Sequence, residues 1–262
     1  MRKMLGMAIV LAAMPIADVH AADLLVKAPP IPNVSYNWSG LYIGGFAGYG
    51  WGRRDVTNVN GNAPFPAGTV RNLNANGGLG GVQVGFNYEF PSSWLIGIEA
   101  DFAWSHIAGT NAQFSSVPGF LAGERKARLS TEHFDMNSIT TVTGRVGHAF
   151  NNWLLYAKGG GAWAGTKSNS NTTDPTTGLL ESTTSDSRVR SGWTVGAGVE
   201  WGFSQNWSAL LEYDFLDFGT MTNNVSPTYY NGATGLATLT RNSRLDASII
   251  KVGLNYRFGL PH

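Results

Sequence analysis

The sequence predicts an all-β fold, an eight-stranded antiparallel up-and-down transmembrane β-barrel. Beyond the N-terminal segment, apolar side chains recur at every second position, the period of a strand whose two faces differ. The alternating segments are joined in turn by short turns and by long polar stretches, as in outer-membrane barrels. The nine tryptophans lie near the ends of these segments. Together these patterns favour a barrel that crosses a membrane.

Residues 1–21 have the pattern of a secretory signal peptide. Arg2 and Lys3 form a basic start, a mostly apolar stretch follows, and Ala21 stands at the expected cleavage point. The apolar stretch is too short for a membrane-spanning helix, which needs roughly 20 residues. Residues 22–37 are rich in proline and predict an extended periplasmic linker.

Composition excludes several classes of protein. The formal net charge of +1 argues against bulk binding to nucleic acid. Cysteine is absent, which excludes a disulfide scaffold and a thiolate metal site. Charged residues make up 13% of the chain, against about 25% in a typical soluble domain. A low charge content is expected where one face of every strand contacts lipid.

Eight segments alternate between apolar and polar residues. The alternation is clearest at 82–90, 96–104, 193–203 and 207–215, and weaker at 41–51, 140–150, 153–165 and 250–258. Short turns are expected at 91–93, 151–152 and 204–206, and long polar connections at 52–77, 107–132, 167–189 and 219–243. Four such connections are rare in compact soluble domains but usual in outer-membrane barrels. The sequence therefore predicts a barrel over residues 38–258 with four long external loops.

Tryptophan marks two planes on the expected outer face. Trp94 and Trp104 are ten residues apart in the sequence, which gives a height of about 23 Å on a strand tilted by about 45°. The apolar band of a bacterial barrel is about 25 Å tall and is flanked by aromatic girdles. Trp38 is the exception, because it lacks the parity of the apolar face. The predicted interfacial aromatics are Trp51, Trp94, Trp104, Trp153, Trp163, Trp193, Trp201 and Trp207.

The opposite parity places charged residues inside the barrel. These predicted lumenal residues are Glu89, Glu99, Asp101, Arg145, Lys158, Glu200, Glu212, Asp214, Lys251 and Arg257. The interior of an eight-stranded barrel is just wide enough for side chains to fill. We therefore expect the acids and bases to pair with one another, and inward glycines to leave room for them. The alternative is a polar lumen that conducts ions.

No residue pattern predicts a catalytic, cofactor-binding or metal site. The histidines lack the spacing of metal ligands, and the glycine clusters at 77–81 and 159–161 lack the strand–turn–helix context of a phosphate loop. The alternative is a catalytic group of Asp101, Ser105 and His106 with His133, near the external end of two strands. We expect a protein that is not an enzyme and that holds no cofactor.

Three motifs resemble one family. They are WSGLYIGG at 38–45, GRVGHAF at 144–150 and VGLNYRF at 252–258. Together they resemble the small outer-membrane β-barrel proteins of alphaproteobacteria, a porin-superfamily group distantly similar to the OmpA transmembrane domain. The resemblance implies eight strands and insertion by the barrel-assembly machinery. It also implies a C-terminal assembly signal, formed by Val252, Leu254, Tyr256 and Phe258. Here a short tail, 259–262, follows that signal.

The expected location is the outer membrane of a Gram-negative cell, in contact with lipid and lipopolysaccharide. The expected role is structural: support of envelope integrity and display of surface loops. Three alternatives remain open: a narrow porin, a surface ligand-binding protein or adhesin with haem as one candidate ligand, and a small lipid-modifying enzyme. The sequence specifies no oligomeric state.

Overall fold

The computed structural model describes residues 36–59, 68, 70–118, 125–225 and 239–258. The predicted signal peptide at 1–21, the linker up to residue 35 and the tail at 259–262 lie outside these described residues. Within the described residues, no helix is long and apolar enough to cross a membrane.

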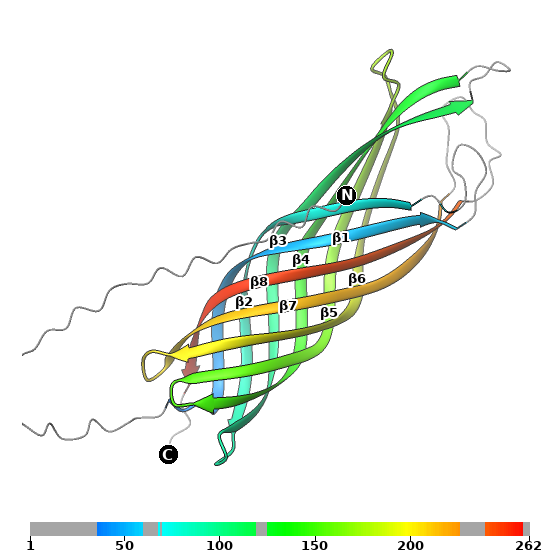
Figure 1. The fold of residues 1–262 in the computed structure, drawn as a ribbon. Helices are drawn as coiled ribbons and strands as arrows, with labels where there is room; N and C mark the ends of the chain where they lie inside the picture. The colour runs from blue at the N-terminus through cyan, green and yellow to red at the C-terminus, as the bar shows by residue number, and fades with distance from the viewer. Residues whose placement is uncertain (1–35, 60–67, 69, 119–124, 226–238, 259–262) are drawn as a thin grey trace, which may run out of the picture. The chain divides into compact units, whose positions relative to one another are not determined.

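Eight antiparallel strands form a closed barrel, which confirms the predicted fold class. Each strand pairs with the next along the chain, and the first pairs with the last to close the ring (Figure 1). The strands are β1 (Gly40–Asn58), β2 (Val70–Glu89), β3 (Trp94–Pro118), β4 (Arg125–Phe150), β5 (Trp153–Thr173), β6 (Leu180–Gly202), β7 (Trp207–Val225) and β8 (Leu239–Phe258).

The strands extend well beyond their predicted ends. The pairing of β3 with β4 runs from Trp94 opposite His148 to Pro118 opposite Arg125, through the stretch that the sequence suggested was a loop. The β5–β6 pair likewise includes most of 167–189. In Figure 1 these two pairs project past the other strands. Outside an apolar belt the outer face can be polar, so the sequence alternation fades while the backbone ladder continues. We call the end of the barrel at which these two strand pairs project the extended end, and the opposite end the short-turn end.

The outer face carries an apolar belt between two levels of tryptophan. Val82, Val84 and Phe86 on β2 are each more than 40% exposed. Trp153 stacks on Trp201 at the short-turn end, with ring centroids 5.9 Å apart. All eight tryptophans proposed as interfacial are exposed: Trp51, Trp94, Trp104 and Trp153, together with Trp163, Trp193, Trp201 and Trp207. Trp38 is fully buried.

Inward glycines accommodate the large lumenal side chains. Gly85 lies opposite Tyr42 in the β1–β2 register, and Gly198 lies opposite Tyr156 in the β5–β6 register. A Cβ atom at Gly198 would approach the Tyr156 hydroxyl to 2.5 Å, well inside contact distance. Each tyrosine ring therefore fills the space that the facing glycine leaves free.

We predict that Gly198→Ala destabilises the barrel by about 1–3 kcal/mol, because the added methyl overpacks a filled interior. The measurement is the urea midpoint of the protein refolded in detergent micelles, read by tryptophan fluorescence. Gly144→Ala is the matched control, because a Cβ at Gly144 meets no atom within 4 Å. Equal midpoints for the two variants would contradict this packing.

Candidate functional site: the filled lumen

The interior of the barrel is the candidate functional site, and it is filled by three layers. An apolar layer at the short-turn end contains Trp38, Leu95 and Leu154. A middle layer holds the charged residues. A second apolar layer, with Ile107 and Met136 at its centre, lies toward the extended end.

The segment before β1 enters the short-turn end of the barrel. The backbone N–H of Trp38 donates to a Glu89 carboxylate oxygen at 3.2 Å, and Arg257 donates to the Trp38 carbonyl. The ring of Tyr36 lies 4.5 Å from that of Trp38. Tyr36 and Trp38, hereafter the aromatic plug, close this end. In the sequence, Trp38 does not share the alternation of the apolar outer face, and this was the signal that it points inward. No inward plug was predicted.

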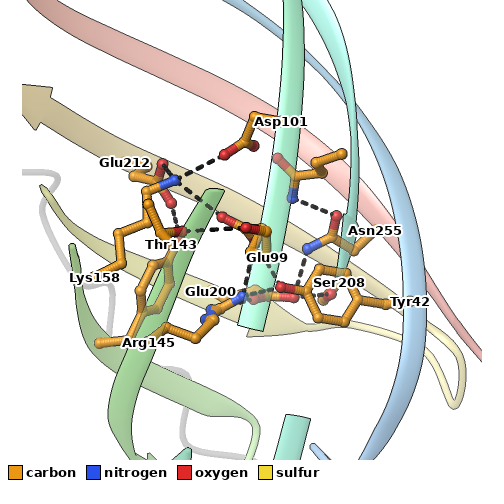
Figure 2. Close-up of polar contacts among 12 residues, drawn as sticks. Tyr42, Glu99, Asp101, Thr143, Arg145, Lys158, Glu200, Ser208, Glu212 and Asn255 are labelled. Atoms are coloured by element: carbon orange, nitrogen blue, oxygen red, sulfur yellow. Dashed lines mark hydrogen bonds and ion pairs between the residues drawn. The ribbon is translucent and has the colours of Figure 1, made fainter. Parts of the chain in front are cut away.

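Arg145 is the centre of the charged layer. Its guanidinium lies 3.1 Å from a Glu99 oxygen and 3.2 Å from a Glu200 oxygen, and all three side chains are buried. It also donates to the Tyr42 hydroxyl at 2.6 Å and lies 3.8 Å from the centroid of the Tyr156 ring. Figure 2 shows these groups converging in the lumen. One guanidinium thus connects strands on opposite sides of the barrel.

Two lysines form the other half of the charged layer. The Lys158 ammonium lies 2.9 Å from Glu99 and 2.6 Å from Glu212, and the Lys251 ammonium lies 2.7 Å from Glu212. Both lysines also pair with Asp101 at 3.2 Å and lie 3.5–3.7 Å from Asp214. Each ammonium group therefore lies among at least three carboxylates, which compensate its charge.

Glu200 connects the charged layer to the plug. It accepts hydrogen bonds from Ser208 at 2.5 Å and Asn255 at 2.9 Å, and it lies 3.5 Å from Arg257. Arg257 in turn donates to the carbonyl of Trp38. The contacts run without a break from the aromatic plug to the lysines.

The structure places nine of the ten predicted lumenal residues in this layer, and Glu89 apart from it. Those nine are Glu99, Asp101, Arg145, Lys158, Glu200, Glu212, Asp214, Lys251 and Arg257. Glu89 is half-buried and contacts the plug segment instead. Sequence reasoning missed Tyr42 and Tyr156, whose hydroxyls donate to Glu99 at 2.6 Å and to Glu212 at 2.5 Å. Both tyrosines stand at inward positions of the alternating pattern, and this was the available sequence signal.

The alternative catalytic group does not assemble. Asp101 is held by two lysines, Ser105 is buried inside, and His106 is exposed on the outer face. His133 is exposed on β4 and lies 2.9 Å from the hydroxyl of Thr110. Among the described residues, no group of three or more His, Cys, Asp or Glu side chains could hold a metal ion.

Comparisons with known proteins identify relatives along nearly the whole chain. The model of the outer membrane protein beta-barrel domain matches residues 9–258. The 31 kDa outer-membrane immunogenic protein of Brucella melitensis is 30% identical, over 95% of this chain and 97% of that protein. The 25 kDa outer-membrane immunogenic protein of Brucella abortus is 26% identical, over 92% of each. The solved structure of the outer membrane protease OmpT from Escherichia coli matches with a TM-score of 0.49 and 13% identity, over 84% of this chain and 97% of that one.

We predict that Arg145→Met lowers the free energy of unfolding by about 3–5 kcal/mol, because it leaves buried carboxylates without their partner. The measurement is again the urea midpoint in micelles. Arg53→Met is the control, since the exposed Arg53–Asp55 pair at 2.9 Å is worth about 0–1 kcal/mol. Unchanged stability together with a newly conducting barrel would contradict a structural role for Arg145.

Proposed function

This chain belongs to the outer membrane β-barrel family, and we propose that it is a closed structural barrel that supports envelope integrity and displays its extended end at the cell surface. Its location is the outer membrane, so lipid and lipopolysaccharide surround it. The observation that carries the proposal is the filled lumen.

The three layers support a structural role over a pore. Trp38 and Leu154 at one end are fully buried, Arg145 and Glu200 in the middle have fully buried side chains, and Ile107 at the other end is fully buried. A conducting path would have to pass all three layers. Opening such a path would break buried ion pairs. This is costly, because each broken pair leaves an uncompensated charge in the low-dielectric interior. We therefore infer a non-conducting barrel.

The extended end supports a display role. β3 and β4 continue as a paired ladder well past Trp104, which marks the edge of the apolar belt. Short periplasmic turns and longer external connections are the rule for such barrels, so we infer that this end faces outward. Relatives named as outer-membrane immunogenic proteins are consistent with a surface that host antibodies reach.

The last strand supports assembly by the barrel-assembly machinery. Val252, Leu254 and Phe258 are exposed on the outer face of β8, and Tyr256 packs against Trp207 with ring centroids 5.2 Å apart. We infer that these four residues form the assembly signal.

We predict that the purified protein gives no stepwise ion conductance in planar bilayers. Trp38→Ala should stay closed as well, because the charged layer and the second apolar layer remain in place. A large open porin measured under the same conditions is the positive control. Regular conductance steps from the wild-type protein would favour the narrow-porin alternative.

We predict that a strain lacking this protein becomes more sensitive to detergent, because the envelope loses a structural component. The measurement is growth across a detergent series, with the wild-type gene returned on a plasmid as the control. Identical growth of the two strains would count against the integrity role and leave surface display as the main role.

A further inference from the structure

A small polar cavity lies inside the barrel toward the extended end, beyond the tryptophan belt. Its volume is about 30 Å³, and one water needs roughly 10–15 Å³ of such space, so the cavity has room for a small solute. Its walls include Arg54, Arg188 and Arg190, together with Phe134 and Ser168. We call it the arginine cavity.

Arg190 is buried in this cavity without a carboxylate partner. The residue is 5% exposed. Among the described residues its side chain donates to Ser243 alone, with one guanidinium nitrogen 3.1 Å from the carbonyl and another 2.9 Å from the hydroxyl. These two contacts use two of the five N–H donors of a guanidinium. A buried cation with only neutral partners is costly, because its charge is uncompensated.

Arg54 brings a second positive charge to the same hydroxyl. Its Nε donates to the Ser243 hydroxyl at 3.1 Å, so the two arginines share one neutral acceptor. The other end of the Arg54 guanidinium pairs with Glu132 at 2.7 Å. Because Glu132 is already paired, it does not compensate Arg190.

The charges around the cavity leave an excess of one positive. Arg54 pairs with Glu132, and Arg188 pairs with Asp186 at 2.7 Å. Arg190 is the remaining cation. The Arg188–Asp186 pair stands at the edge of the cavity, and both side chains are 46% exposed. A solute could therefore reach the cavity from the extended end.

We propose that the arginine cavity binds a small monovalent inorganic anion of about the size of a water molecule, with chloride as the probe. One negative charge would balance Arg190 and reduce its repulsion with Arg54. The volume favours a halide over phosphate or sulfate. The cavity-lining groups point into the barrel, so the anion comes from solution and not from a lipid headgroup. It would tie β1, β6 and β8 together at the extended end.

The test is the stability of the refolded full-length mature barrel in chloride against gluconate at equal ionic strength. The urea midpoint of the wild-type protein should rise with chloride and then saturate. At a chloride concentration 100 times the dissociation constant, the folding equilibrium constant should increase about 100-fold. Arg190→Gln should lose this saturable effect. Arg53→Gln, which changes an exposed arginine paired with Asp55, should keep it.

Bromide provides a second measurement that needs no variant. Crystals of the wild-type protein grown in bromide should give an anomalous peak inside the arginine cavity. An empty cavity in bromide, or equal wild-type midpoints in chloride and gluconate, would overturn the proposal. So would a chloride effect that persists in Arg190→Gln. A larger effect of phosphate or sulfate than of chloride would replace the halide with an oxyanion, against the proposal.

Discussion

The width of an eight-stranded ring is the constraint on which the rest of this structure depends. Such a barrel leaves an interior only as wide as the side chains that fill it. Each inward residue must therefore fit those from the opposite wall. Tyr42 and Tyr156 are accommodated because Gly85 and Gly198 face them. In the same space Arg145 can reach Glu99 and Glu200 on two other strands.

We infer that the charged layer contributes more to the specificity of folding than to net stability. Buried ion pairs recover little beyond the cost of removing their charges from water. However, a shift of one residue in strand register would turn every side chain to the opposite face. Glu99 and Asp101 would then face lipid, and so would Lys158 on a shifted β5. A cation at the bilayer midplane costs about 2–4 kcal/mol, so the charges penalise incorrect registers strongly.

Alternation along the strands predicted most of the barrel, because lipid on one side and a narrow lumen on the other impose a strict period of two. The strand extensions were not predicted, because beyond Trp104 both faces can be polar and the alternation disappears. The aromatic plug was also missed, since Trp38 precedes β1 and its burial depends on contacts with Glu89 and Arg257 that are distant in sequence. The arginine cavity likewise assembles residues from distant strands.

In the proposed closed barrel, stability and permeability depend on different layers of the lumen. Arg145 and its partners occupy the middle of the barrel, whereas the aromatic plug and the Ile107–Met136 layer fill the lumen on either side of them. Loss of one ion pair weakens the tie between opposite walls but leaves both apolar layers in place. In the orientation proposed above, the extended end faces outward, and the one uncompensated buried guanidinium of the described residues, that of Arg190, lies at this end.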